Sequence, residues 1–384
     1  MDYKGMKHRT IIWQSLFFIL MVFAGHQIYL NVQENLNEIG IALSYQFLWT
    51  ESGFDISDSI YKVSSSDTYL KVLLAGVVNT IALASVCIIG ASLIGMTMGI
   101  LRTSKHGLSK KSSYVYIELM RNTPKLLILL FVYTAVINAL PNVRESWSLL
   151  DLVFISNRAI YFPVPGDSGG FICILYILSF WLISNLVLIS AKNVFLIKHS
   201  IYKKAKISIF LISIALTFYI IFSEGYNFVI SFPEISGFDY EGGGRISMQF
   251  IILSFVLSIY HGGQVAEIFR GAIESIPKGQ FEAALSSGLT KWKMYRLVIL
   301  PQAIRVATLP MGNQYLNITK NTSIALAVGY SDLVSITTTS INQTFRPIEL
   351  MTLSMCVYLG ISIIVSSVIN SYNKKVTSTM GLKL

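Results

Sequence analysis

The fold is decided by residues 282–301, EAALSSGLTKWKMYRLVILP, a polar and basic stretch within a chain that is otherwise mostly apolar. Pro277 can open a short helix just before it, and Gly288 lies where such a helix ends with a left-handed residue. Thr290 is suited to cap a second short helix, which Pro301 ends or bends. The pattern predicts two short helices joined by a turn that lie along a membrane surface.

The side chains of this stretch predict a contact face. Phe281 and Leu285 are four residues apart and are expected to be displayed on one side of the first helix. The stretch also contains four small residues that would let another surface approach the backbone closely. These are Ala283, Ala284, Ser286 and Ser287. The alternative is an ordinary interfacial loop with basic side chains that snorkel to water, and spacing alone does not separate the two interpretations.

The composition identifies a membrane protein. Of the 384 residues, 53% are hydrophobic and 13% are charged, with a mean hydropathy of +0.60, whereas soluble domains carry about 25% charged residues. Runs long enough to cross a bilayer occupy residues 11–30, 69–101, 114–140, 171–190, 207–222, 247–271 and 349–370. A weaker candidate, residues 303–318, contains Arg305 and Pro310. The sequence therefore predicts an all-α membrane protein with about eight transmembrane helices.

The placement of basic residues supports this count. With a cytoplasmic N-terminus, the inside segments hold 19 Lys and Arg residues and the outside segments hold seven, as the positive-inside rule requires. Eight spans place both termini in the cytoplasm. The net charge of +10 thus reflects orientation rather than nucleic-acid binding. The first apolar run could alternatively be a cleaved signal peptide. The three cysteines lie in apolar spans without CxxC spacing and are expected to be packing residues.

At this point the spacing of Glu282-Ala283-Ala284, Gly288 and Leu300-Pro301 resembles the EAA loop of permease subunits of ATP-binding-cassette (ABC) importers. One departure is Val298, where the family more often has Ile. Flanking segments are similar to the polar amino-acid branch of that family; they are HGGQVAEIFRGAIESIPKGQ, LPQAIRVATLPMGNQYLNITKNTS and YVYIELMRNTPKLLILLFVY. The eight spans resemble the larger permease of general L-amino-acid importers, a type I permease core of five spans plus three extra helices.

This resemblance implies a mechanism and a set of partners. The ATPase-coupling residues would be Glu282, Ala283, Ala284, Gly288, Leu300 and Pro301, docked in a groove of a separate ATPase. The chain carries no GxxxxGK[ST] phosphate loop, so no cofactor is expected on it, and ATP and Mg are expected on the ATPase subunits. A second homologous permease, as a heterodimer, and a periplasmic amino-acid-binding protein complete the expected assembly in the bacterial inner membrane.

The resemblance also suggests five parts. They are a first helix with an external loop at 1–68, the first part of the core at 69–140, an insertion with two extra helices at 141–246, the second part of the core at 247–372, and a cytoplasmic tail at 373–384.

Two charged pairs lie near the cytoplasmic ends of spans. Glu118 and Arg121 are three residues apart, and so are Glu267 and Arg270. Each pair could neutralise itself on one helix face as scaffold or gate, and a substrate contact is the alternative. Pro124 is expected to kink its helix.

An amino-acid zwitterion needs donors for its carboxylate and acceptors for its ammonium group. The candidate substrate-pathway residues are Asn79, Thr80, Asn313, Gln314, Lys320, Asn321 and Ser323. Interhelical hydrogen bonding is the alternative for Asn79 and Thr80, and a polar turn is the alternative for the later stretch. His261, beside two glycines, is expected to be hydrogen-bonded rather than a proton site.

Two other classes fit less well. An ion-coupled secondary transporter usually shows an unpaired acid in mid-span, whereas the acids of this chain lie beside arginines at the ends of spans. An intramembrane enzyme would need a catalytic constellation, and no HExxH or GxSxG motif is present. No metal-binding or catalytic residues are expected.

Overall fold

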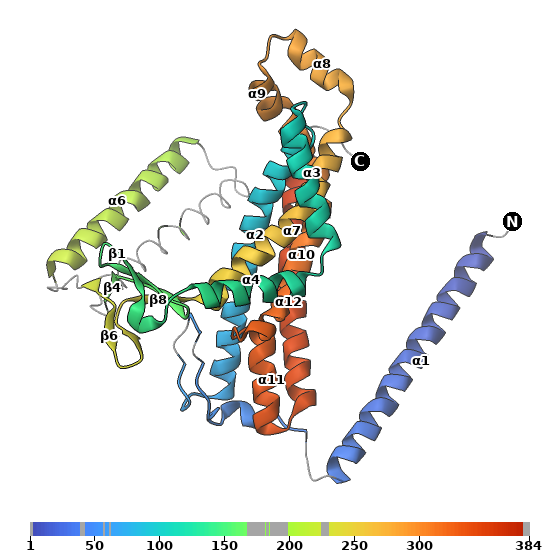
Figure 1. Ribbon diagram of the computed structural model, residues 1–384. Helices are drawn as coiled ribbons and strands as arrows, with labels where there is room; N and C mark the ends of the chain where they lie inside the picture. The colour runs from blue at the N-terminus through green and yellow to red at the C-terminus, as the bar shows by residue number, and fades with distance from the viewer. Residues whose placement is uncertain are drawn as a thin grey trace. The chain divides into compact units, whose positions relative to one another are not determined.

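Figure 1 shows a computed structural model of the 384-residue chain. The structure describes residues 3–38, 43–56, 58–60, 63–166, 181, 184, 199–223 and 230–378. Contacts divide the chain into two units. The first comprises Met1–Ala82, Tyr315–Leu326 and Ser331–Leu384, and the second comprises Leu83–Gln314 and Ala327–Tyr330.

The described residues contain four helices that are long and apolar enough to cross a membrane. They are α1 (Tyr3–Glu38), α2 (Tyr69–Arg102), α7 (Met248–Glu274) and α12 (Pro347–Ser378). Two bent helix pairs raise this number to six. The described part of the chain thus accounts for four to six spans, and the predicted total of eight stays a prediction. Apart from residues 181 and 184, predicted span 171–190 lies outside the described residues, and 207–222 falls in α6 (His199–Ser223).

The predicted continuous span 114–140 is wrong in one respect, because it is broken into two helices. These are α3 (Gly107–Asn122) and α4 (Lys125–Ala139), which are bent by 104°. Thr123 between them is extended (φ −99°, ψ 133°), as expected for a residue that precedes proline. The predicted kink at Pro124 is therefore confirmed. Both helices pack against α7 within the second unit.

Glycines allow α2 and α7 to approach closely within the second unit. A Cβ atom added at Gly95 would overlap the side chain of Val265, and one added at Gly99 would lie 2.6 Å from the Cβ of Phe269. Val265 and Phe269 are themselves buried. Small residues at such spacing are typical of helix pairs in membranes, since they let backbones pack by direct van der Waals contact.

The first unit has its own apolar core. The core joins the short helix η1 (Gln46–Trp49), α2, α11 (Leu333–Thr344) and α12, and its members are Phe47, Leu48, Tyr69, Val72, Leu73, Leu333, Ile336 and Leu350. Helix α11 ends at Phe345 in a left-handed conformation (φ 56°), and Pro347 opens α12, so the two helices run side by side as a hairpin (Figure 1). Glu349 of α12 is buried and accepts from Arg346 and from the backbone of Ser44.

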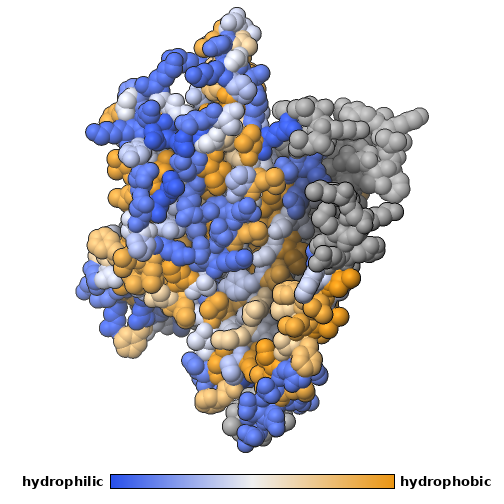
Figure 2. All heavy atoms as spheres, turned by 90° about the vertical axis from the view of Figure 1, so that its right-hand side faces the viewer, coloured by the Kyte–Doolittle hydropathy of each residue, from blue (hydrophilic) through white to orange (hydrophobic). Residues whose placement is uncertain are grey.

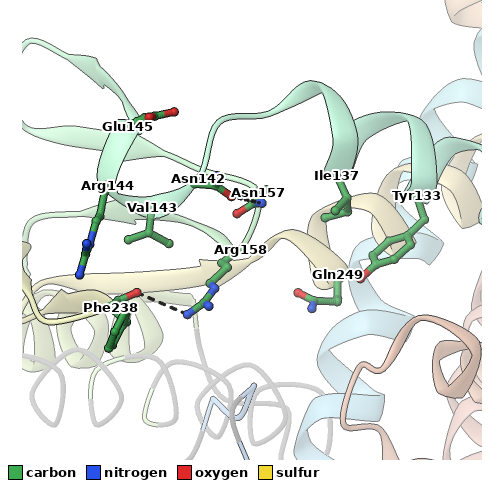
Figure 3. A pocket seen from close by; sticks show the side chains of 10 residues that line it. All are labelled: Tyr133, Ile137, Asn142, Val143, Arg144, Glu145, Asn157, Arg158, Phe238 and Gln249. Carbon is green, nitrogen blue, oxygen red and sulfur yellow. Dashed lines mark hydrogen bonds between the residues drawn. The ribbon is translucent and has the colours of Figure 1, made fainter.

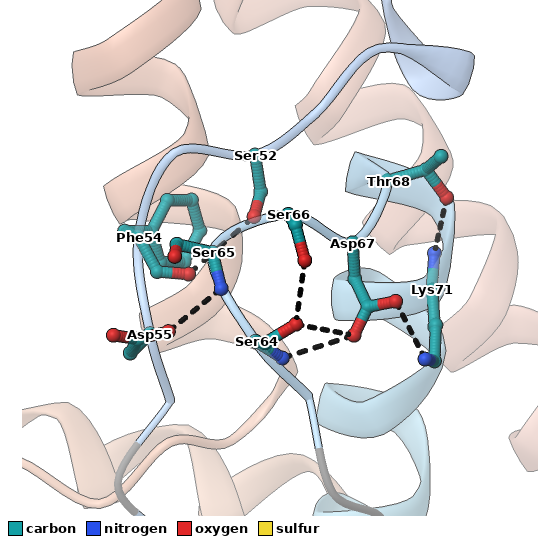
Figure 4. Close-up of polar contacts among 9 residues, drawn as sticks. All are labelled: Ser52, Phe54, Asp55, Ser64, Ser65, Ser66, Asp67, Thr68 and Lys71. Carbon is teal, nitrogen blue, oxygen red and sulfur yellow. Dashed lines mark hydrogen bonds and ion pairs between the residues drawn. The ribbon is translucent and has the colours of Figure 1, made fainter.

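Serine and aspartate side chains organise the turn before α2 (Figure 4). The carboxylate of Asp67 accepts from the backbone of Ser64 at 2.9 Å and from Lys71 Nζ at 2.6 Å. The backbone of Lys71 in turn donates to the hydroxyl of Thr68. The hydrogen bond from Lys71 lowers the pKa of Asp67 below its ordinary value. The turn thus fixes the first residues of α2.

Three small antiparallel sheets in the second unit lie almost entirely within the predicted insertion at 141–246, for which two extra helices are expected. One sheet has the order β1-β2-β3-β8, and the others pair β4 with β5 and β6 with β7. The strands are β1 (Trp147–Leu149), β2 (Val153–Ile155), β3 (Ala159–Phe162), β4 (Val164–Pro165), β5 (Ile230–Ser231), β6 (Glu234–Ser236), β7 (Asp239–Glu241) and β8 (Gly244–Ser247). The fold is therefore mostly helical rather than all-α.

The buried Tyr161 ties these sheets together. Its ring lies 4.5 Å from that of Tyr240, centroid to centroid, with the ring planes tilted by 36°, and its hydroxyl donates to the carboxylate of Asp239. Burial, and then the hydrogen bond that the hydroxyl donates to Asp239, raise the pKa of Tyr161. The sheet then leads directly into α7, whose first turn is capped by the hydroxyl of Ser247.

Apolar side chains remain exposed along the long helices. Phe131 and Leu93 in the second unit and Met355 in the first are examples, and Figure 2 shows hydrophobic residues over much of the face it presents. Exposed apolar surface of this extent marks contact with lipid or with other proteins.

Candidate functional site

The stretch at 282–301 forms the predicted pair of short helices joined by a turn. Helix α8 (Lys278–Ser286) is followed by its C-cap Ser287 and then by Gly288, which has φ +75°. The backbone N–H of Gly288 donates to Leu285 at 3.0 Å, and that of Leu289 donates to Ala284 at 3.2 Å. These two hydrogen bonds define a Schellman motif, in which glycine is favoured because it has no Cβ to clash. The prediction of a left-handed residue at Gly288 is confirmed.

The second helix begins as predicted and continues further than predicted. The hydroxyl of Thr290 accepts from the backbone of Lys293 at 3.4 Å and caps α9 (Lys291–Met294). Of the two alternatives, that Pro301 ends this helix or bends it, the first is wrong. The chain passes through a π-helical segment, η3 (Tyr295–Ile299), into α10 (Leu300–Asn321), and Pro301 lies in its first turn.

The contact face of the turn differs from the predicted one. Phe281 packs edge-on against Tyr295, with 6.4 Å between ring centroids, so it braces α8 against η3 instead of lying free beside Leu285. Leu285 is 51% exposed and Trp292 is 72% exposed. Ala284 is buried against the chain itself, while Glu282 and Ala283 are exposed. The exposed side chains of the turn thus include Glu282, Leu285 and Trp292, and Trp292 was not among the residues predicted from the sequence.

Charged residues cluster at the end of α7, just before this turn. Arg270 donates to Glu267 at 2.5 Å and to Glu274 at 2.5 Å. The expected pairing of Glu267 with Arg270 is present, with Glu274 as an additional partner. Glu118 instead accepts from the side chain of Asn122 at 3.0 Å. Both Glu118 and Arg121 are described by the structure, and no ion pair joins them.

Asn79 and Thr80 of α2 are fully buried within the first unit. The amide of Asn79 donates to the carbonyls of Asp58 at 2.7 Å and Ser331 at 2.8 Å. The hydroxyl of Thr80 accepts from the backbone of Leu333 at 3.0 Å, at the start of α11. These contacts hold the non-helical backbone before α11, since such backbone at membrane depth needs protein partners. They agree with the hydrogen-bonding alternative considered for both residues.

The other candidates on α10 do not gather at one point. Gln314 is buried in the second unit, where its amide contacts His261 Nδ1 at 2.6 Å and Gln264 Oε1 at 2.5 Å. His261 is thus hydrogen-bonded, as expected. Asn313 and Lys320 are exposed, whereas Asn321 and Ser323 are half-buried and the Ser323 hydroxyl donates to the Lys320 carbonyl.

Asp332 is a buried acid that the sequence argument did not single out. Its carboxylate accepts from the backbone of Ser335 at 2.8 Å and caps α11. An aspartate that directly follows a Gly-Tyr-Ser run and precedes an apolar stretch is a recognisable helix-start signal, which could have identified it. Among the described residues, no group of three or more His, Cys, Asp and Glu is arranged to hold a metal ion.

Comparison with known proteins places this geometry in context. Residues 91–378 match the family described as "Binding-protein-dependent transport system inner membrane component". The chain is 35% identical to YhdX of Escherichia coli over 96% of this chain and 94% of that protein. It is 34% identical to AapQ of Rhizobium johnstonii, a general L-amino acid transport system permease protein, over 96% of this chain and 92% of AapQ.

A third relative is BztB of Rhodobacter capsulatus, a glutamate/glutamine/aspartate/asparagine transport system permease protein. It is 32% identical over 93% of this chain and 92% of BztB. The family match covers well over half of the chain, and these relatives match it almost from end to end. The chain therefore belongs to the family of multi-pass inner-membrane components of binding-protein-dependent transport systems.

Proposed function

We propose that this chain is the transmembrane permease subunit of an ATP-driven ABC importer for polar or general L-amino acids. The observation that carries the proposal is the turn at 282–301, a polar surface element with an exposed leucine and tryptophan that joins α7 to α10. Similarity to AapQ and BztB over almost the whole chain supports an amino-acid substrate.

The structure of the turn suits it to transmit movement from an ATPase subunit to the permease. Its Schellman motif and the packing of Phe281 on Tyr295 make the two short helices a single rigid piece. A groove on an ATPase subunit would receive Leu285 and Trp292 as apolar anchors, with Glu282 at the rim. Movement of that groove would then be transmitted through Leu300 and Pro301 into α10. ATP and Mg belong to the ATPase subunits, so the permease supplies the pathway and no catalytic group.

The proposed assembly contains more than one kind of permease. The insertion at 141–246 distinguishes this chain from shorter permeases, which favours a heterodimer with a distinct partner chain. Two ATPase subunits would bind on the cytoplasmic side, together with both termini, and a periplasmic amino-acid-binding protein would deliver substrate from outside. The 19-to-7 distribution of basic residues supports this orientation.

The substrate pathway is proposed to follow the exposed polar side of α10. Asn313 and Lys320 offer an amide and a cation along it, and Asn321 and Ser323 continue it into the next segment. Asn79 and Thr80, buried in the first unit, and Gln314, buried in the second, are retained as proposed pathway residues. The pairs of Arg270 with Glu267 and Glu274 are proposed to brace the helix end next to the ATPase.

The test is affinity purification of the chain from its native host in mild detergent, with mass spectrometry of the proteins that accompany it. Recovery of an ATPase subunit together with a second permease is the expected result. Recovery of an ATPase with this permease alone would replace the heterodimer by a homodimer. If the chain were recovered alone in several detergents, the importer assignment would be wrong, and an ion-coupled carrier would be the next hypothesis.

A further inference from the structure

A cavity opens where α4 ends and α7 begins, within the second unit. Its volume is about 530 Å³, and it lies between the turn at 141–146, the start of β3 and the β6–β7 hairpin (Figure 3). The charge distribution of the sequence predicts this end of the helices to be external. Sites for small ligands usually measure about 300–1,000 Å³, so the cavity is large enough for an amino acid.

Two arginines give the cavity a positive wall. Arg144 and Arg158 both line it, and Figure 3 shows their side chains extending in the same direction, toward Phe238. Among the described residues, no carboxylate lies within ion-pair distance of either guanidinium. Glu145 also lines the cavity, but its side chain lies on the opposite side of the backbone from that of Arg144 (Figure 3).

Most donors of these arginines remain available. Arg158 donates one weak hydrogen bond to the Phe238 carbonyl at 3.4 Å, and Arg144 donates one to the Gly237 carbonyl at 3.5 Å. Each guanidinium carries five N–H donors in a planar fork, which matches a carboxylate bidentately. The ring of Phe238 lies 5.0 Å from the Arg144 guanidinium and helps to fix its position.

The start of α7 contributes a second attraction for anions. Gln249 is the second residue of this 27-residue helix and lines the cavity. A helix N-terminus carries a positive partial charge that favours an anion. The side-chain oxygen of Gln249 is buried and accepts no hydrogen bond from any described residue. Tyr133 of α4 lies next to it (Figure 3). The cavity thus offers strong donors on one wall and an acceptor without a donor on another.

We propose that this cavity binds a free α-amino acid, with the carboxylate held by Arg144 and Arg158 and the ammonium group facing Gln249. The proposal rests on the function proposed above, because it assigns an entry site to the same transported class. An acidic side chain of a partner protein would also satisfy the arginines. A free amino acid is favoured because it alone supplies the ammonium donor that Gln249 lacks and fits a cavity that extends inward from the sheets to α4.

The experiment is saturation-transfer NMR on the full assembly in lipid nanodiscs, without the binding protein. The probes are L-alanine, propionate, which lacks the ammonium group, and ethylamine, which lacks the carboxylate. We expect transfer to L-alanine, weaker transfer to propionate and none to ethylamine. The double variant Arg144→Gln and Arg158→Gln should reduce the L-alanine signal at least tenfold.

A matched control is available in the same sheets. Arg245 pairs with Asp239 at 3.6 Å and does not line the cavity, so Arg245→Gln should keep the L-alanine signal. An unchanged signal in the double variant would overturn the proposal. Displacement of L-alanine by equimolar inorganic phosphate would also overturn it, because the cavity would then be a general anion site.

A third overturning result is a double variant that keeps the L-alanine signal but loses affinity for the binding protein, which would identify a docking contact. ATPase recovered with the permease in the same preparations shows separately whether the importer assignment stands. Absence of saturation transfer to L-alanine in the unaltered protein, with the ATPase still bound, therefore counts against this inference alone.

Discussion

Single residues control the turn at 282–301 through backbone conformation rather than through bulk. A Cβ added at Gly288 would meet no atom within 4 Å, so space is open there, yet φ is +75°. Aspartate and asparagine tolerate this left-handed conformation better than other residues with side chains. Substitution of Gly288 by aspartate or by asparagine therefore compares two side chains of nearly equal shape that differ in charge.

The variant Gly288→Asp should insert normally and lose the ATPase subunit, because it places a second negative charge six residues from Glu282 on the face that docks. We expect at least a tenfold drop in ATPase recovered by affinity purification. Gly288→Asn has nearly the same shape without the charge and should retain most of the ATPase. Full assembly of the Asp variant would contradict a docking role for this face.

Lys320 is an exposed cation near the end of α10. If the polar side of α10 lines the pathway, Lys320→Ala should lower amino-acid uptake severalfold while the subunits still assemble, because the carboxylate of the substrate would lose a counter-charge. Lys374→Ala, at an exposed position on α12, serves as the control and should not change uptake. Uptake by Lys320→Ala at the unaltered level would assign the residue to the scaffold.

At the scale of helices and strands, single residues correctly predicted the helix ends and breaks that depend on local backbone conformation. Gly288, Thr290 and the break at Pro124 follow from the conformations that glycine, threonine and proline favour. The three sheets were missed because their strands have only two to four residues and pair with distant partners, as Ala159 does with Ser247. The contact of Phe281 with Tyr295 was missed for the same reason, since a helix periodicity does not show what a neighbouring helix covers.

The packing of α2 against α7 can be tested at Gly95. Gly95→Ala would place a methyl group onto Val265 and should destabilise the protein by about 1–3 kcal/mol, because the two helices must separate or strain. Gly271→Ala is the control. No atom lies within 4 Å of a Cβ at that helical position, so a gain of about 0.5–1 kcal/mol is expected. Thermal unfolding in detergent measures both, and equal stability of the two variants would exclude the close contact.

At the scale of the whole molecule, the sequence predicted the long apolar helices but not the cavity beside them. Hydropathy located α2, α7 and α12 closely, because about twenty apolar residues are hard to place anywhere except in lipid. Hydropathy treated α3 and α4 as one continuous helix, because it does not register the 104° bend at Thr123 and Pro124. The cavity beside Arg144 and Arg158 was beyond prediction, since it is formed by segments about 95 residues apart in the chain.

The orientation of the molecule gives a further prediction. A cysteine placed at Asp151, in the turn between β1 and β2, should react with a membrane-impermeant maleimide on spheroplasts. A cysteine at Leu285 should react only after the membrane is permeabilised. The native Cys356 is exposed and should be replaced first. Labelling of the position-285 cysteine from outside would invert the proposed topology.

The glycine contact between α2 and α7 also bears on how the protein is made. Gly95 and Val265 are 170 residues apart in the sequence, and a ribosome adding about 5–20 residues per second needs roughly 10–30 s to cover that distance. During this interval α2 is already synthesised and its glycine face has no α7 to meet. A chaperone, an insertase or lipid must cover that face until α7 is inserted. Slow translation of residues 141–246 would therefore lengthen the time in which the nascent chain can make non-native contacts.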